Sequence, residues 1–348
     1  MKIVDLRSDT LTMPSDAMRE AMFKAELGDD VFGEDPTTNR LEEIAANKMG
    51  HEAALFVPSG TMGNLICVLT HCKRGEEVIL GNLSHTFLYE GGGMSALGGV
   101  HPYTVANRSD GTMALEEIES AIRGNNVHYP KTSLICLENT HNRCSGAPLT
   151  VEYTDQVCVL AKRYSLSVHL DGARIFNAAV ALGVDIKELV KEVDSLSFCF
   201  SKGLSAPVGS VICGKRSFVE NARRIRKVLG GGMRQCGVLA AAGIFALEHM
   251  VDRLEEDHIN ASILAEGISK IPGLKIELSR LKTNIMYVDL ESSKMGADEF
   301  GKKLSKMGIK VLTTGPKRFR MVTHYGIDED DIEFTLQTLK EAVRDIMK

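Results

Sequence analysis

The chain has 348 residues, of which 44% are hydrophobic and 25% are charged, and its formal net charge is −5. This length suits one large α/β domain with a smaller one, and the acidic balance excludes nucleic acid and anionic membrane as main partners. No signal pattern opens the chain and no apolar run approaches the ~18 residues of a membrane span, so we expect a cytoplasmic protein. The eight cysteines lie without a C-x-x-C pair, which favours reduced thiols and no bound metal.

Short β-rich runs alternate with helical stretches along the first two thirds of the chain. A polar N-terminal arm precedes two amphipathic helices, at 15–27 and 38–49. The strands that we expect after them are 54–57, 77–80, 132–137, 167–170, 195–200 and 208–213. Helices are expected between these strands at 62–72, 115–122 and 151–164. This alternation predicts a mainly parallel sheet covered on both faces, with ligands at the carboxyl ends of its strands.

The last third of the chain begins with a long helical stretch, 235–271, whose helical period is interrupted, although not by a proline. After Pro272-Gly273 we expect a second α/β unit with strands at 274–278, 284–289, 311–313 and 319–323 and helices at 297–307 and 330–347. We therefore predict a large domain over residues 1–245 and a helical connector with a small C-terminal domain over residues 246–348.

Lys202 is the most informative residue, because it comes between Ser201 and Gly203 where the buried strand 195–200 stops. A lysine amine held partly out of water at a sheet edge loses its proton more easily and can attack a carbonyl. A Schiff base with pyridoxal phosphate (PLP) needs such an amine. Taken alone, the segment also fits a surface lysine in an ordinary turn.

Two further segments lie where strand ends are predicted. Gly60 and Thr61 open a helix after a strand, where free N–H groups and the helix dipole favour an anion such as phosphate; a plain strand–helix turn is the alternative. Asp171 ends a buried strand and needs a cation, for which a protonated pyridine nitrogen would serve. Arg174 could bind a carboxylate, or it could form a salt bridge with Asp171.

Two other motifs are weaker when taken alone. His85 follows the strand 77–80 and could stack on a cofactor ring or act as an acid or base, but it also fits an ordinary histidine. Arg234 follows a cluster of three glycines, which suits phosphate recognition or a flexible loop. The run 91–96 matches G-x-G-x-x-A, but it follows a helical segment and not a strand, which argues against a dinucleotide site.

Together these segments resemble the L-threonine aldolases, the low-specificity and allo-preferring branch of the fold-type-I PLP enzymes. The resemblance extends over essentially the whole chain and implies an aspartate aminotransferase-like large domain with a mainly parallel sheet and a small C-terminal α/β domain. It rests on the motifs Leu6–Thr10, Gly28–Pro36, Pro58–Asn64, Glu138–Asn142, Asp171–Arg174, Ser201–Ser210, Gly230–Gln235 and Arg320–His324.

The resemblance implies a role for each site residue. Lys202 would be the Schiff-base lysine, Asp171 would hold the pyridine nitrogen and His85 would stack on the ring. The other cofactor-binding residues that it implies are Gly60, Thr61, Arg174 and, from a neighbouring subunit, Arg234. The substrate-binding residues that it implies are Ser8, Arg174 and Arg320 for the carboxylate and His128 for the β-hydroxyl. The base that removes the hydroxyl proton stays open between His85, His128 and a phosphate-bound water.

The implied reaction is the PLP-dependent retro-aldol cleavage of L-threonine and L-allo-threonine to glycine and acetaldehyde, with activity on other β-hydroxy-α-amino acids. It belongs to threonine catabolism and glycine biosynthesis. We expect a homodimer that completes its sites across the interface, and a tetramer, because the apolar helix 238–247 behind Arg234 suits a partner better than solvent. β-Elimination or aminotransfer on the same cofactor, and a cofactor-free binding protein, remain as alternatives.

Overall fold

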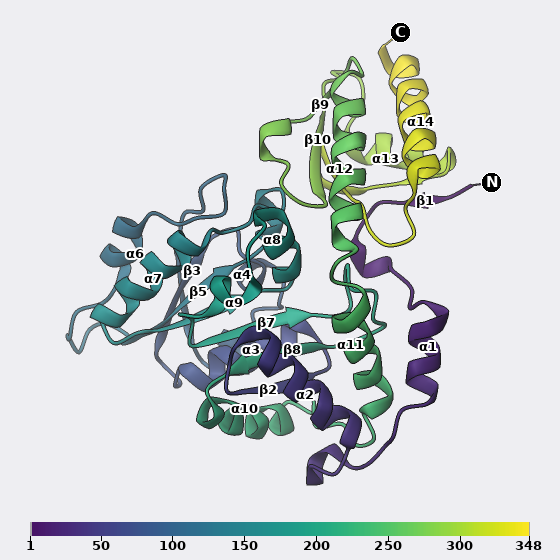
Figure 1. Cartoon of the computed structure of the whole chain (residues 1–348). Coiled ribbons are helices and arrows are strands. Elements are labelled where there is room, and N and C mark those ends of the chain that lie inside the picture. Colours follow the sequence, from purple (N-terminus) through teal and green to yellow (C-terminus); the bar gives the residue numbers. More distant parts are fainter. Residues whose placement is uncertain (1, 348) are drawn as a thin grey trace.

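The computed structural model describes residues 2–347, with side chains up to residue 344, and contains a seven-stranded and a four-stranded sheet in two units (Figure 1). The larger sheet has the order β2-β8-β7-β6-β5-β3-β4. Its strands are β2 (Ala53–Val57), β3 (Glu77–Gly81), β4 (His101–Val105), β5 (Thr132–Glu138), β6 (Ser167–Asp171), β7 (Ser195–Cys199) and β8 (Ser210–Gly214). The strands from β4 to β7 pair in parallel, whereas β8 is antiparallel to both of its neighbours, so the prediction of a mainly parallel sheet is confirmed.

Helices cover both faces of this sheet. They are α1 (Asp16–Phe23), α2 (Pro36–Met49), α3 (Gly60–His71), α4 (His85–Leu88), α5 (Gly93–Ala96), α6 (Leu115–Ala121), α7 (Val151–Arg163), α8 (Ile175–Leu182), α9 (Ile186–Val190), α10 (Arg216–Val228) and α11 (Gly237–His249). Successive residues of β2 point to opposite faces, as the two-residue period of a strand requires. Leu55 and Val57 pack with α3 and α10, whereas Ala54 and Phe56 share a core with α2 and α7.

The smaller unit is built on a four-stranded antiparallel sheet of order β12-β13-β10-β9. Its elements are α12 (Leu254–Ser269), β9 (Leu274–Lys275), β10 (Ile285–Leu290), α13 (Ala297–Lys306), β11 (Ile309–Lys310), β12 (Leu312–Gly315), β13 (Arg318–Val322) and α14 (Glu329–Met347). The chain begins in this unit, because β1 (Val4–Asp5) pairs with β11 and Val4 and Leu6 join its core. The N-terminal arm then runs to α1, beside α11 of the larger unit (Figure 1).

Three sequence predictions need correction or completion. The long helix expected over 235–271 is two helices, α11 and α12, with a break at 250–253 that contains no proline or glycine. Strand β4 and helices α8, α9 and α10 were not predicted. Helix α11 is mostly buried against α1 and α2 and is not an exposed apolar helix, although Phe245 and Ile244 line a surface cavity there. The domain boundary at residue 245 stays a prediction.

No helix among the described residues is long and apolar enough to span a membrane. All eight cysteines are buried and none forms a disulfide.

Candidate active site

Four predicted or newly found side chains converge at the carboxyl edge of the large sheet. Asp171 is the last residue of β6 and Glu138 the last of β5, while His85 follows β3 within one short turn. Because parallel strands end at the same edge, these side chains lie together. Strand β7 ends at Cys199, so Lys202 lies in the bend three residues beyond the strand and not at its end. Its backbone oxygen accepts a hydrogen bond from Thr12 Oγ1 at 2.9 Å, and its charge acts on the pKa of both Asp9 and His85.

Asp171 is 2% exposed and is held by neutral donors. Asn64 Nδ2 donates to its Oδ2 at 2.9 Å, and the backbone N–H of Ala173 donates to its Oδ1 at 3.1 Å. Among the described residues no lysine or arginine forms an ion pair with it, so the salt bridge with Arg174 considered above is absent. A buried carboxylate without a cation is costly, and a protonated pyridine nitrogen would supply the missing charge. The residue therefore fits the ring of PLP.

The start of α3 fits the phosphate of the same cofactor. Ser59 caps the helix by accepting from Met62 N at 3.2 Å. The N–H groups of Gly60 and Thr61 make no hydrogen bond with the described part of the chain, and Thr61 is exposed. A Cβ added at Gly60 would lie 2.7 Å from Cys199 Sγ, so only glycine lets the helix start this close to β7. Free N–H groups at a helix N-terminus favour an anion.

Two carboxylates, those of Glu138 and Glu90, position His85. Sequence analysis assigned neither of them a role beside this histidine. Its backbone N–H donates to Glu138 Oε2 at 2.6 Å, and its Nδ1 lies 2.9 Å from Glu90 Oε1. Burial lowers the pKa of His85, but the Glu90 hydrogen bond and the charge of Asp171 outweigh it, so that pKa is raised overall. Burial likewise raises the pKa of Glu90. The His85–Glu90 pair therefore holds a proton more readily than either group would in water.

Arg174 forms a buried, two-pronged ion pair with Asp9 of the N-terminal arm. Its Nε and Nη2 donate to the two carboxylate oxygens at 2.6 Å each. Burial tends to raise the pKa of Asp9, but Arg174 holds it well below its usual range, with help from Lys202 and Arg320. Asp9 was quoted only as part of a motif, and the sequence gives no signal that joins it to Arg174, 165 positions away.

Arg320 lines a cavity of about 530 Å³ together with His85, Tyr89, Asn142, Arg143, Tyr287 and residues 312–314. Arg320 Nη1 donates to Asn142 Oδ1 at 2.7 Å and Nη2 to the Arg7 carbonyl at 3.0 Å, whereas its buried Nε has no partner. Burial and the nearby charge of Arg174 lower the pKa of Arg320. Two adjacent guanidinium groups and an unpaired N–H favour an incoming carboxylate.

Three predicted site residues remain: Ser8, His128 and Arg234. None of them lines this cavity. Ser8 is half-buried beside Asp9, and its Oγ accepts from Thr10 N at 3.3 Å. His128 is exposed in the loop before β5, at the opposite edge of the sheet, roughly 20 Å from the carboxyl end of that strand. Arg234 is 51% exposed and pairs with Asp29 at 2.5 Å.

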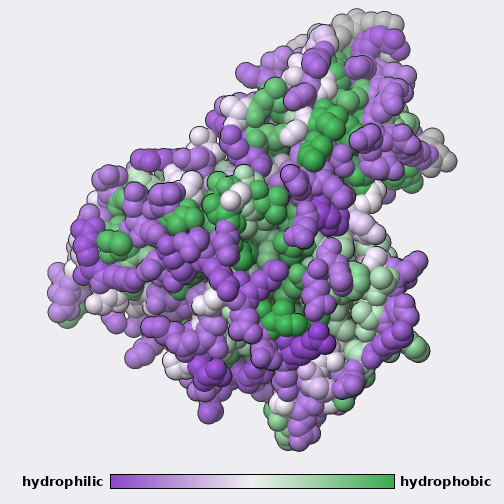
Figure 2. Space-filling view, viewed as in Figure 1, coloured by the Kyte–Doolittle hydropathy of each residue, from purple (hydrophilic) through white to green (hydrophobic). Residues whose placement is uncertain are grey.

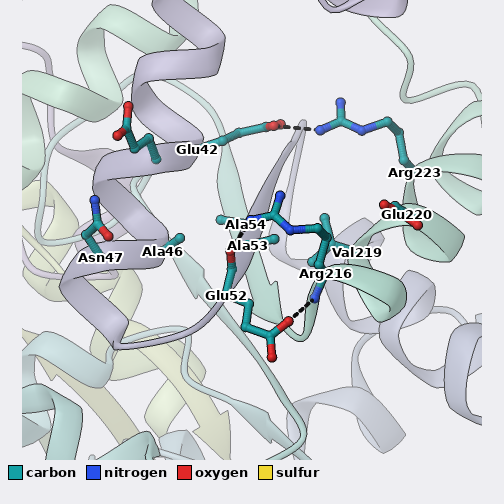
Figure 3. A pocket seen from close by; sticks show the side chains of 11 residues that line it. Glu42, Ala46, Asn47, Glu52, Ala53, Ala54, Arg216, Val219, Glu220 and Arg223 are labelled. Atoms are coloured by element: carbon teal, nitrogen blue, oxygen red, sulfur yellow. Dashed lines mark hydrogen bonds and ion pairs between the residues drawn. The ribbon is translucent and has the colours of Figure 1, made fainter.

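A second cavity, of about 490 Å³, lies between α2, α10 and the outer edge of β2. Figure 3 shows Glu42 paired to Arg223 and the Glu52 carboxylate bonded to the backbone N–H of Arg216. None of the predicted site residues lines it. The cavity at the carboxyl edge, which His85 and Arg320 line, is therefore the better candidate site.

Comparison with known proteins identifies the family. The beta-eliminating lyase family model matches residues 5–291. The chain is 52% identical to the low-specificity L-threonine aldolase 1 of Arabidopsis thaliana, over 99% of this chain and 97% of that protein. It is 43% identical to the low specificity L-threonine aldolase of Escherichia coli K12, over 95% of this chain and 96% of that protein.

Solved structures share the fold. A Leishmania major threonine aldolase has a TM-score of 0.84 at 19% identity and covers 97% of this chain and 99% of that chain. A structure of SPT with PLP has a TM-score of 0.78 at 19% identity and covers 99% of this chain and 88% of that chain. The predicted fold class and the predicted family are confirmed, and the chain belongs to the low-specificity L-threonine aldolases, a family of PLP-dependent lyases with the type-I fold.

Proposed function

We propose that this protein cleaves L-threonine and L-allo-threonine to glycine and acetaldehyde, and that it accepts other β-hydroxy-α-amino acids. The observation that carries the proposal is Asp171, a buried carboxylate that forms no ion pair with a lysine or arginine of the described residues, at the edge where Lys202 and the arginines meet. The curated relatives that carry the same activity in their names support it.

The cofactor residues that we propose are those whose surroundings fit PLP. When bound, PLP supplies an electron sink that stabilises negative charge at the substrate Cα. Lys202 is the attachment point for the cofactor, and its amine is then available to move a proton at Cα. Asp171 holds the pyridine nitrogen, while Gly60 and Thr61 bind the phosphate through their free N–H groups.

Arg320 and Arg174 orient the substrate carboxylate. Arg174 is already held by Asp9 through Nε and one N–H of Nη2, so its Nη1 and the second N–H of Nη2 remain, whereas Arg320 offers an unpaired Nε. Ser8, next to Asp9 in the chain, adds a hydroxyl donor. Fixing the carboxylate fixes rotation about the Cα–Cβ bond, on which cleavage depends.

His85 is the side chain best placed within one chain to take the β-hydroxyl proton. It lines the same cavity as Arg320, and its pKa is raised by Glu90 and Asp171 against the effect of burial. A neutral imidazole with a raised pKa is a stronger base near neutral pH. Its ring face is also the surface on which we expect the cofactor ring to stack.

Arg234 and His128 would act in the site of a neighbouring subunit. Arg234 lies 5.4 Å from the ring of Phe32, which is 71% exposed, and Phe23 and Val228 are also strongly exposed. Figure 2 shows further apolar surface over α1 and α11. An exposed aromatic ring beside an arginine, with other strongly exposed apolar side chains on the protein surface, favours a partner subunit. We propose at least a homodimer, and a tetramer if the distant His128 also serves a site.

The first test is cofactor attachment and product. Wild-type protein loaded with PLP should absorb above ~400 nm, retain the cofactor on Lys202 after borohydride reduction and release acetaldehyde from threonine. Lys202→Ala should lose turnover by several powers of ten. A 2-oxo acid as the product would instead assign β-elimination, and wild-type turnover by Lys202→Ala would refute the role of this lysine.

The second test mixes subunits. An Arg234→Ala chain with an intact Lys202 and a Lys202→Ala chain with an intact Arg234 should each be weak alone. A mixed dimer has one site with both residues, so activity should recover toward half of wild type after correction for the homodimers. No recovery, with mixed dimers proven by mass spectrometry, would show that Arg234 acts in its own chain.

We propose that the enzyme works in the cytoplasm, in threonine catabolism and glycine formation. The buried free cysteines are compatible with a reducing compartment.

A further inference from the structure

A continuous row of side chains, buried except for the half-buried His71, runs from the end of α3 to Asp171. His71 Nε2 lies 2.8 Å from Ser195 Oγ, which lies 2.9 Å from His169 Nδ1. His169 Nε2 lies 3.2 Å from Asn64 Oδ1, and Asn64 Nδ2 lies 2.9 Å from Asp171 Oδ2. His169 and Ser195 are 0% exposed and Asn64 is 2% exposed, so these groups bond to one another and not to solvent.

The amide of Asn64 fixes the direction of the bonds nearest Asp171. Its Nδ2 faces two carboxylates, Asp171 at 2.9 Å and Glu90 at 2.8 Å, which places the two amide hydrogens on these acceptors. Its Oδ1 then accepts from the Ser197 hydroxyl at 2.6 Å and from His169. The opposite orientation of the amide would set its oxygen against the Asp171 carboxylate, which is repulsive.

The donor and acceptor of each further hydrogen bond follow from those of the bond before it. An amide oxygen only accepts, so His169 carries its proton on Nε2 and its Nδ1 is an acceptor. The Ser195 hydroxyl therefore donates its single hydrogen to His169 Nδ1 and accepts from His71, which must carry its proton on Nε2. Burial lowers the pKa of His169 to about 3 and that of His71 to about 4, so both rings are neutral near pH 7 and have one donor each.

We propose that His71, Ser195, His169 and Asn64 form a one-way chain of hydrogen-bond donors that fixes the orientation of the Asp171 carboxylate. The inference rests on the proposed function, in which Asp171 faces the pyridine nitrogen of PLP. Donors aligned in one direction polarise one another and strengthen the last bond of the chain, here the one to Asp171. The four are positioning residues, because none of them touches the cofactor or the substrate.

The direct test is made on the cofactor-free protein. Nitrogen-15 NMR of the histidine rings should show His169 and His71 neutral, each with its proton on Nε2. A proton on Nδ1 of His169, or a charged ring near pH 7, would overturn the proposal. This measurement does not depend on the reaction, so it can fail while the proposed function holds, or the reverse.

The second test uses PLP labelled with nitrogen-15 in its ring. Ser195→Ala removes the middle link of the hydrogen-bond chain. His71→Phe removes its outermost donor while keeping the stacking on Phe218, whose ring centroid lies 4.6 Å from that of His71. In both variants the pyridine nitrogen signal should move toward the unprotonated form. The kcat should fall by about tenfold, which is the effect of one hydrogen bond, with little change in KM.

Thr132→Val is the matched control for these variants. Like Ser195, Thr132 is the first residue of a buried strand. Its hydroxyl bonds to Glu77 at 3.1 Å and takes no part in the hydrogen-bond chain. This variant should leave the nitrogen signals and kcat unchanged. An unshifted pyridine nitrogen in both Ser195→Ala and His71→Phe, or the same shift in Thr132→Val, would overturn the proposal.

Discussion

Replacing Asp9 by asparagine should destabilise the protein far more than the same change at Asp5. Arg174 donates two hydrogen bonds to Asp9, at 2.6 Å each, and Arg7 donates two to Asp5, at 2.8 and 2.6 Å. The side chains of Asp9 and Arg174 are 0% and 7% exposed, whereas those of Asp5 and Arg7 are 23% and 43% exposed. The two variants therefore compare the same kind of ion pair in a buried and in a solvent-exposed position.

The expected magnitudes follow from burial. Losing one partner of a buried ion pair leaves an uncompensated charge and costs about 3–5 kcal/mol, whereas an exposed pair contributes about 0–1 kcal/mol. Unfolding entropies of about 2.1 cal/mol/K per residue give about 0.7 kcal/mol/K for a chain of this length. The Tm should therefore fall by about 4–7 °C in Asp9→Asn and by at most about 1.5 °C in Asp5→Asn.

Calorimetry of the cofactor-free protein measures both shifts, because bound cofactor would add its own stabilisation. The pH dependence gives a further check. Although burial opposes it, Arg174 lowers the native pKa of Asp9, so the carboxylate stabilises the fold fully above its unfolded pKa of about 4. That contribution is lost as the pH falls through the lowered pKa. A Tm of Asp9→Asn within about 1.5 °C of wild type at pH 7 would refute the reasoning.

Three other changes test the site. Glu90→Gln removes a carboxylate that raises the pKa of His85, so the acid limb of kcat/KM should move to lower pH; an unmoved limb would exclude His85 as the base. Gly60→Ala should weaken PLP binding, measured by titration of the apoprotein, because its Cβ would meet Cys199 Sγ at 2.7 Å; adding Cys199→Ala should restore it, and failure to do so would refute the steric explanation. Arg320→Lys should raise KM and lower kcat, and constants within about twofold of wild type would exclude the carboxylate role.

The sequence predicted the residues that follow parallel strands. Asp171, Gly60 and His85 come directly after β-rich runs, and the rule that parallel strands end at one edge places them together without further information. The break between α11 and α12 was missed because no proline or glycine marks residues 250–253, although the helical period is interrupted in this stretch. An interrupted period alone does not say where tertiary packing ends one helix and begins the next.

The partners of the site residues could not be predicted in the same way. Asn64 lies in an apolar helix, where a polar side chain is a weak signal, and nothing local shows that it faces Asp171 on another element. Glu90 follows α4 at the end of a segment that the sequence pattern indicated only as helical, with no role assigned to this carboxylate. Such contacts depend on how α3, α4 and β6 pack, and this packing is set by the whole core and not by a motif.

The arrangement of charge explains why a zwitterionic amino acid suits this cavity. Glu90 and Asp171 place negative charge beside His85, whereas Arg320 and Arg174 place positive charge at the other side, where Asp9 balances only part of it. The carboxylate of an amino acid therefore gains most at the arginines, and its ammonium group or the cofactor nitrogen gains most near the acids. A hydroxy acid without the amine would bind through the arginines alone, so its affinity depends on Arg320 but not on Asp171. Binding of such an analogue to the apoprotein consequently separates the two halves of the site: Asp171→Asn should leave it unchanged, and Arg320→Lys should weaken it.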